Sequence, residues 1–122
     1  MTESLFIVNA TPDERDRILV ALAGESVSIE VYDTAALFLD RVGATPSGCV
    51  LAPIDLPGMG LRALLEEINR RHLPLAVVVI GRDSELASAV ELVRAGAFDF
   101  LEHPFSDGRL RSVVRQAIGA CA

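Results

Sequence analysis

Five short apolar runs are spread along the chain, and each is followed by a longer stretch whose apolar residues recur at helical spacing. The runs are "LFIV" (5–8), "VSIEVY" (27–32), "GCVLA" (48–52), "LAVVVI" (75–80) and "AFDFL" (97–101). The second run alternates, which is typical of a half-buried strand, and the fourth is apolar throughout, which is typical of a strand buried on both faces. We therefore expect five β-strands.

The first two intervening stretches predict helices from their spacing and their end signals. Ile18, Leu19 and Leu22 share one face of a helix that we expect to pack on the sheet. The next helix opens at either Asp33 or Thr34, because both side chains can accept a hydrogen bond from the first turn.

Three further helices each carry an apolar stripe that we expect to face the core. Either Ser106 or Asp107 caps the last of them. The predicted inward residues are Leu61, Leu64, Leu65 and Ile68 in the third helix, Leu86, Ala89, Val90 and Val93 in the fourth, and Leu110, Val113, Val114, Ala117 and Ile118 in the fifth. The fivefold alternation of strand and helix predicts one α/β domain, residues 1–122, with a parallel sheet covered on both faces. In such folds ligands bind beyond the carboxyl ends of the strands.

Composition and charge narrow the function classes. The chain has 122 residues, of which 51% are hydrophobic, and a net charge of −6. We expect no nucleic-acid binding by this domain itself, because that requires a basic face. No apolar run approaches the roughly 20 residues that span a bilayer, and the amino terminus lacks the pattern of a signal peptide, so we expect a cytoplasmic protein without membrane contact. The two cysteines, Cys49 and Cys121, are not spaced as metal ligands.

Two longer motifs carry a family resemblance. "IDLPGM" (54–59) and "AVELVRAGAFDFLEHPF" (89–105) resemble the receiver domain of bacterial two-component response regulators, and most of all receivers that precede a LuxR-type helix-turn-helix domain. The resemblance covers nearly the whole chain. It implies a flavodoxin-like fold of five βα units, with a parallel sheet in the order 2-1-3-4-5 and a role in phosphorelay signal transduction.

The same resemblance implies five groups at the carboxyl edge of the sheet. These are two acidic residues that hold Mg²⁺, an aspartate that accepts the phosphoryl group, a Thr or Ser, and a Lys. In this sequence the five positions fall on Asn9, Ala10, Pro53, Gly81 and His103. None of these residues has a carboxylate, and proline has no nucleophilic side chain. We therefore expect a degenerate receiver that is not phosphorylated, is not an enzyme, and binds Mg²⁺ weakly or not at all.

Other features of the family are kept. Pro104 stands where the family has a proline that often follows a cis bond, and Phe100 occupies the position of its switch aromatic. Because Phe98 and Phe100 alternate with the residue between them, we expect at least one of the two in the core.

The charged and titratable residues near this edge have two interpretations each. Asp55 is either a displaced acceptor or a solvated loop residue, and Arg82 either binds an anion or is a free surface side chain. Asp13 and Glu14 begin a helix, where carboxylates either interact favourably with the helix dipole or together attract a cation weakly. His103 could serve as a pH switch or as a polar residue before a structural proline.

Three functions remain open. The domain could regulate a DNA-binding output domain through protein contacts, act as a stand-alone adaptor, or bind a flavin-like small ligand. The last is disfavoured because "NATPDE" (9–14) lacks a Ser/Thr-rich phosphate loop and the chain has no Trp. We expect a homodimer through the fourth helix, fifth strand and fifth helix, with Leu92 partly exposed beside Glu91, Arg111 and Arg115, and with Val20 of the first helix marking the alternative face.

Overall fold

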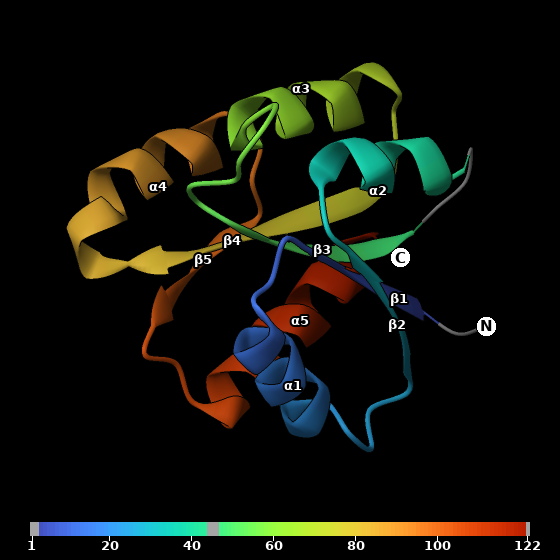
Figure 1. Ribbon diagram of the computed structural model, residues 1–122, viewed down its shortest axis with the longest axis vertical. Coiled ribbons are helices and arrows are strands. Elements are labelled where there is room, and N and C mark those ends of the chain that lie inside the picture. Colours follow the sequence, from blue (N-terminus) through green and yellow to red (C-terminus); the bar gives the residue numbers. More distant parts are fainter. Residues whose placement is uncertain (1–2, 44–46, 122) are drawn as a thin grey trace.

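The computed structural model describes residues 3–43 and 47–121, and Figure 1 shows its strands as one twisted sheet between two layers of helices. All strand pairs are parallel, in the order β2-β1-β3-β4-β5. The predicted fold class and strand order are therefore correct. The elements are β1 (Glu3–Val8), α1 (Pro12–Ala21), β2 (Val27–Tyr32), α2 (Ala35–Arg41), β3 (Gly48–Pro53), α3 (Leu61–Arg70), β4 (Leu75–Arg82), a 3₁₀ turn η1 (Asp83–Glu85), α4 (Leu86–Arg94), β5 (Asp99–His103) and α5 (Asp107–Cys121).

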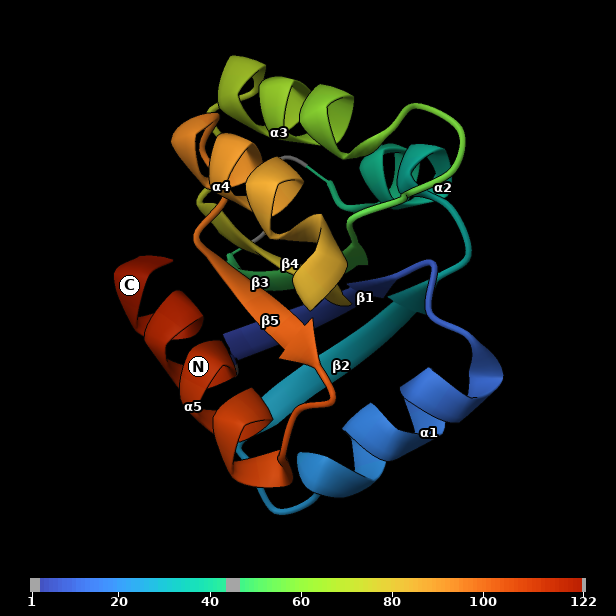
Figure 2. The same cartoon turned by 90° about the vertical axis from the view of Figure 1, so that its left-hand side faces the viewer.

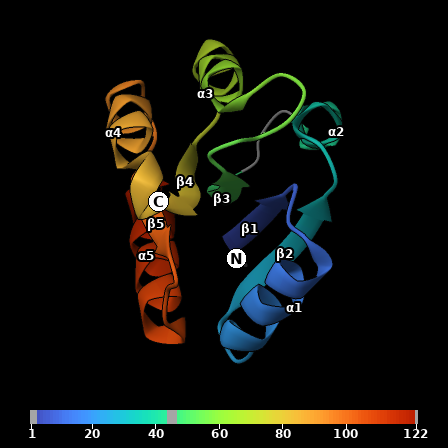
Figure 3. The ribbon, with the colours of Figure 1, turned by 60° about the vertical axis from the view of Figure 1, so that its left-hand side comes forward.

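Two hydrophobic cores lie on opposite faces of the sheet. Helices α1 and α5 cover one face, and α2, α3 and α4 cover the other (Figures 2 and 3). Strand β1 contributes side chains to both cores, because successive side chains of a strand point to opposite faces. Phe6 and Val8 pack under α2 and α3, and Leu5 and Ile7 pack under α1 and α5. Cys49 is fully buried in the second core, as expected of a small apolar residue.

Side-chain caps fix where the helices begin. The hydroxyl of Thr11 accepts a hydrogen bond from the backbone N–H of Glu14, whose carboxylate accepts one from the N–H of Thr11 in return. Thr34, rather than Asp33, caps α2. Ser106 Oγ accepts a hydrogen bond from the N–H of Arg109 at 3.0 Å and so caps α5.

Most predicted inward stripes are confirmed. All four named residues of α3 and all five of α5 are buried. On α1, Ile18 and Leu22 are buried, but Leu19 is 38% exposed because Ala21 completes the buried face instead. Strand β5 begins two residues later than predicted and extends to His103, since its ladder with β4 starts where Asp99 pairs with Val78.

The stripe predicted for α4 is wrong. Leu86, Val90 and Val93 are 54%, 43% and 40% exposed, whereas Ala89 and Leu92 are buried. The helix lies over β4 and β5 at one border of the sheet, with α3 on only one side (Figure 2). The residues of α4 that face α3 and the sheet are therefore buried. The apolar residues on its outer side remain uncovered.

Both phenylalanines near β5 also differ from expectation. Phe98 and Phe100 are each half-buried, and they pack against opposite cores, Phe98 on the α1–α5 side and Phe100 on the α2–α3–α4 side. An edge strand has no neighbour beyond it to cover such rings completely. Among the described residues, no helix has both the length and the apolar character that crossing a membrane requires.

Candidate functional site

The five positions singled out by the sequence meet at the carboxyl edge of the sheet. Asn9 and Ala10 follow β1, Pro53 ends β3, Gly81 lies near the end of β4 and His103 ends β5. The parallel ladder holds them together, since Pro53 is in register with Ile80, and Gly81 is in register with Glu102. This edge, with the loops that follow the strands, is called the carboxyl rim below.

Asn9 is used for structure rather than left open at the rim. Its backbone adopts a left-handed conformation, with φ of 57°, which Asn tolerates better than most residues. Its N–H donates to Tyr32 O at 2.8 Å, and its side-chain Nδ2 donates to Asp33 O at 3.0 Å. These bonds tie the loop after β1 to the loop after β2. Ala10 is half-buried against the second core, and its side chain has no ligand atom.

Pro53 closes β3 and is half-buried at the rim. Its carbonyl accepts a hydrogen bond from Leu56 N–H at 3.2 Å, which forms the turn that follows. The cavity beside it is only about 10 Å³, and its lining residues are Ile7, Val8, Asn9, Ala10, Glu14, Ile18, Leu51, Ala52, Pro53 and Ile80. That volume is about the space of one water molecule, so this part of the rim is closely packed.

The Phe100 ring occupies the space that a side chain at position 81 would need. A Cβ atom at position 81 would lie 2.9 Å from Phe100 Cε1 and 3.1 Å from Ile54 Cγ2, closer than packed carbons approach. A hydroxyl-bearing side chain therefore does not fit there unless the Phe100 ring moves. The glycine at this position and the aromatic side chain of β5 are thus parts of one packing arrangement, which sequence reasoning treated separately.

His103 is directed toward α1. Its Nε2 lies 3.2 Å from Glu14 Oε2, and its ring centroid lies 4.8 Å from that of Phe105. The guanidinium of Arg17 stacks on the other ring, with Cζ 4.6 Å from the Phe105 centroid, and donates to the Phe105 carbonyl. The His103–Pro104 peptide bond between them is cis. Residues from α1 and from the end of β5 therefore form one polar and aromatic cluster.

The remaining charged candidates are solvent-facing. Asp55 is exposed in the turn after β3, and its side chain has no hydrogen bond or ion pair with any residue that the structure describes. The Arg82 guanidinium is likewise exposed and unpaired within that part of the chain. Over residues 3–43 and 47–121, His, Cys, Asp and Glu side chains form no group of three or more with the arrangement of a metal site.

The predicted interface residues do not share one surface. Leu92 is 9% exposed and belongs to the first core, which corrects the prediction that it is exposed. Glu91 is exposed on α4 and lines shallow hollows with Arg62 of α3. The sequence assigned Leu92 to the surface because it took the outer apolar residues of α4 as the inner ones.

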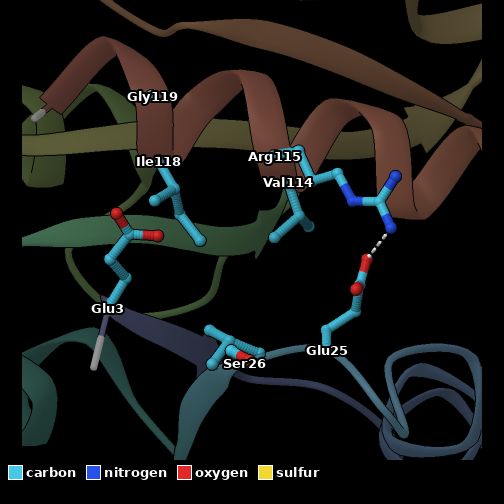
Figure 4. A pocket seen from close by; sticks show the side chains of 8 residues that line it. Glu3, Glu25, Ser26, Val114, Arg115, Ile118 and Gly119 are labelled. Carbon is cyan, nitrogen blue, oxygen red and sulfur yellow. Dashed lines mark ion pairs between the residues drawn. The ribbon is translucent and has the colours of Figure 1, made fainter. Parts of the chain in front are cut away.

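Arg111 and Arg115 face away from α4. Arg111 Nη1 donates to Ala21 O at 3.3 Å, at the end of α1. Arg115 Nη2 lies 2.6 Å from Glu25 Oε1 and forms an ion pair with it (Figure 4). The two arginines are one helical turn apart and so share a side of α5, the side toward α1 and the loop before β2. Arg109, two residues earlier, instead pairs with Asp99 of β5 at 3.4 Å.

The exposed apolar residues of α4 are the surface that sequence reasoning missed. Leu86, Val90 and Val93 follow the i, i+4, i+7 spacing of one helix face, and we name this surface the α4 stripe. The spacing was visible in the sequence. What it could not show was that the neighbours of α4 leave this face uncovered.

Similarity to known proteins agrees with this geometry. The family model for the response regulator receiver domain matches residues 5–115. The chain is 32% identical to the transcriptional regulatory protein FixJ of Azorhizobium caulinodans, over all of this chain and 59% of FixJ. It is 34% identical to the DNA-binding transcriptional regulator NtrC of Escherichia coli, over 80% of this chain and 21% of NtrC. The chain thus spans less than two thirds of the length of these curated relatives.

Solved structures show the same relationship in three dimensions. Full-length FixJ from B. japonicum superposes with a TM-score of 0.89 at 27% identity, covering 99% of this chain and 60% of that one. The receiver domain of NtrX from Brucella abortus superposes with a TM-score of 0.83 at 31% identity, covering 94% of this chain and 98% of that one. A family model that spans most of the chain and a solved receiver domain matched almost end to end lead to one conclusion: the chain belongs to the response regulator receiver domain family.

Proposed function

We propose that this chain is a pseudo-receiver: a cytoplasmic receiver domain, not an enzyme, that signals through protein contacts and accepts no phosphoryl group. The observation that carries the proposal is the residue that ends β3. Pro53 occupies the place that the family resemblance assigns to the acceptor aspartate, and it has no nucleophilic atom. The nearest loop carboxylate, Asp55, lies two residues on in an exposed turn.

The Mg²⁺ that the resemblance implies does not fit the residues at this rim. Mg²⁺ binds hard oxygen ligands, of which carboxylates supply both the oxygen and the charge. Here the Asn9 side chain carries no charge and donates an amide N–H to the Asp33 carbonyl, and Ala10 and Pro53 have no side-chain oxygen. The carboxylate that does line the closed cavity, Glu14, is engaged by the helix cap and by His103. No step of the proposed function passes through a metal ion.

Intact-mass measurement after incubation with acetyl phosphate and Mg²⁺ tests this proposal. We expect no gain of a phosphate in the wild type or in Pro53→Asp, because that variant still lacks the other four groups. A receiver that retains all five groups serves as the positive control. A hydroxylamine-sensitive phosphate on wild-type Asp55 would overturn the proposal, and calorimetry that detects sub-millimolar Mg²⁺ binding would overturn the argument about the metal.

We further propose that the domain forms a homodimer through the α4 stripe. Its three apolar side chains are each 40% exposed or more, and they lie on one face of the helix. Burying partly exposed Leu and Val side chains from both copies stabilises association through removal of apolar surface from water. Charged side chains occur on the three elements of the predicted interface, with Arg94 in the last turn of α4 and the Asp99–Arg109 pair on β5 and α5. A two-fold contact can place such opposite charges across from each other.

Sedimentation of three proteins tests the dimer. We expect the wild type to dimerise in the micromolar range, Val90→Glu to be monomeric, and Val20→Glu to behave as the wild type. Val20 is a matched control because it is 73% exposed and lies on α1, on the opposite face of the sheet. A wild type that stays monomeric at high micromolar concentration would exclude a constitutive dimer. Loss of the dimer only in Val20→Glu would place the interface on α1.

The output of this domain is proposed from its relatives. FixJ is described as a transcriptional regulatory protein and NtrC as a DNA-binding transcriptional regulator, and this chain aligns with only part of each. We propose that this domain regulates a DNA-binding domain that follows it. The coding sequence downstream of codon 122 tests this point directly. A stop codon there would favour the alternative, a stand-alone adaptor.

A further inference from the structure

A second hollow opens at the carboxyl rim on the side of α1 and β5. Its volume is about 300 Å³, far larger than the closed cavity beside Pro53. It is lined by Glu14 and Arg17 of α1, Arg82 at the end of β4, and His103 and Pro104 at the end of β5. We name it the arginine hollow. It does not include Pro53, and it shares only His103 with the five positions at which the family resemblance places the phosphorylation site.

The two arginines of this hollow differ in how they are held. Arg17 is preorganised, because its guanidinium stacks on Phe105 and donates to the Phe105 carbonyl. Arg82 carries a charge that no described residue neutralises: its backbone N–H donates to Glu85 Oε1 at 2.9 Å, but its guanidinium makes no such contact. An oriented guanidinium and a free one thus line the same space.

The one carboxylate of the hollow is already engaged. Glu14 Oε1 accepts a hydrogen bond from Thr11 N–H at 3.2 Å, and its Oε2 lies 3.2 Å from His103 Nε2. Two guanidinium groups against one carboxylate leave an excess of positive charge at this spot, although the whole chain has a net charge of −6. A local cationic site on an acidic protein is a place where a small anion can be attracted and held.

We propose that the arginine hollow binds a phosphate-class oxyanion without forming a covalent bond. Guanidinium donors line the hollow from two different elements, Arg17 on α1 and Arg82 on β4, while His103 of β5 is held by Glu14. A tetrahedral oxyanion presents oxygens in both directions, whereas a carboxylate presents two oxygens in one plane. Guanidinium groups pair with such oxygens through two parallel hydrogen bonds. This inference concerns ligand binding only and stands whether or not the domain is a pseudo-receiver.

Phosphate titration of the ¹⁵N-labelled 122-residue chain at constant ionic strength tests the proposal. We expect saturable amide shifts that are confined to the start of α1 and the ends of β4 and β5. Arg82→Gln is expected to weaken binding about tenfold, because a charge-assisted hydrogen bond is lost. Glu14→Gln is expected to strengthen binding about threefold, because it removes a negative charge from the lining while a glutamine can still serve the helix cap.

Two controls separate a built site from general charge attraction. Arg41→Gln changes the net charge by the same amount on α2, away from the hollow, and is expected to leave the affinity for phosphate unchanged. Acetate, as the carboxylate probe, is expected to bind at least several-fold more weakly than phosphate. Absence of saturable shifts, equal weakening by Arg82→Gln and Arg41→Gln, or weaker binding in Glu14→Gln would each overturn the site. Acetate binding as tightly as phosphate would overturn the assignment to the phosphate class.

Discussion

Helices α4 and α5 flank the same edge strand, β5, and both carry an apolar stripe, but only α5 buries the stripe that its spacing predicts. The five inward residues of α5 are at most 8% exposed, whereas three of the four predicted for α4 are at least 40% exposed. Helix α5 contacts β1, β3, β4 and β5 and also packs on α1; Figure 3 shows it on the same side of the sheet as α1. The main contacts of helix α4 within the sheet are with β4 and β5.

The difference shows what an amphipathic pattern can and cannot predict. Spacing tells which apolar residues share a face of a helix. Spacing does not tell how much of that face the rest of the protein covers. A helix over the centre of the sheet can bury a broad arc, while a helix at the border buries a narrow one and leaves the remaining apolar residues for another partner.

The largest expected effect comes from truncating the buried stripe of α5. Leu110→Ala should lower the free energy of unfolding by about 3 kcal/mol, because Leu110 is fully buried and its removal leaves a cavity. The matched change Leu86→Ala on α4 should cost less than about 0.5 kcal/mol in the monomer, since that side chain is 54% exposed. Urea denaturation followed by circular dichroism measures both. An equal loss of unfolding free energy in both variants would mean that Leu86 is buried as fully as Leu110.

A smaller loss of stability is expected from adding a side chain at Gly81, next to the Phe100 ring. Gly81→Thr should destabilise the fold by about 2 kcal/mol, because its Cβ would overlap Phe100 Cε1 and Ile54 Cγ2. Gly119→Ala on α5 provides the contrast, since nothing lies within 4 Å of a Cβ there and alanine favours the helix by about 0.5–1 kcal/mol. Thermal unfolding of both variants gives the comparison. A Gly81→Thr protein as stable as the wild type would show that the Phe100 ring moves aside at little cost.

The charged side of α5 should matter less. Arg115→Gln should cost about 0.5 kcal/mol, since the arginine of its ion pair with Glu25 is largely exposed and screened by solvent. Because this pair faces the loop before β2 rather than α4, the variant should sediment as the wild type does. If Arg115→Gln dissociated the dimer, the interface would include this side of α5 and not only the α4 stripe.

The smallest effect concerns α3, the neighbour of α4 in the same layer. Hydrogen bonds from Arg70 and then Arg71 lower the pKa of Glu67 from its ordinary 4.5 to about 2, and Arg71 also donates to Leu39 O of α2 at 2.9 Å. Because the pKa is lower in the folded state, this group stabilises the fold above about pH 4.5, and the contribution disappears as the pH falls toward 2.

Glu67→Gln should therefore lower the stability slightly at pH 7 and not at all at pH 2. Urea denaturation of the wild type and the variant at both pH values measures this. The effect should be modest because the arginines are exposed. An equal loss at both pH values would mean that Glu67 contributes through packing rather than through its charge.

Part of the carboxyl rim could be predicted from single residues. That Pro53 offers no acceptor and Ala10 no metal ligand follows from their side chains alone, wherever they lie. The contacts of the rim could not be predicted in the same way. Glu14 meets His103 across 89 positions of the chain, and the absent side chain of Gly81 is replaced by the ring of Phe100 from another strand.

The sequence by itself determined the order of strands and helices, the faces of α3 and α5, and which side chains are available at the rim. Those features depend on local periodicity, on capping residues such as Ser106, and on the identity of each side chain. The tertiary structure alone decided which side of α4 is covered and where Arg111 and Arg115 point. Those outcomes depend on neighbours that are distant in the chain. A helix surface belongs to the core when such a neighbour removes it from water, and it stays available as an interface when none does.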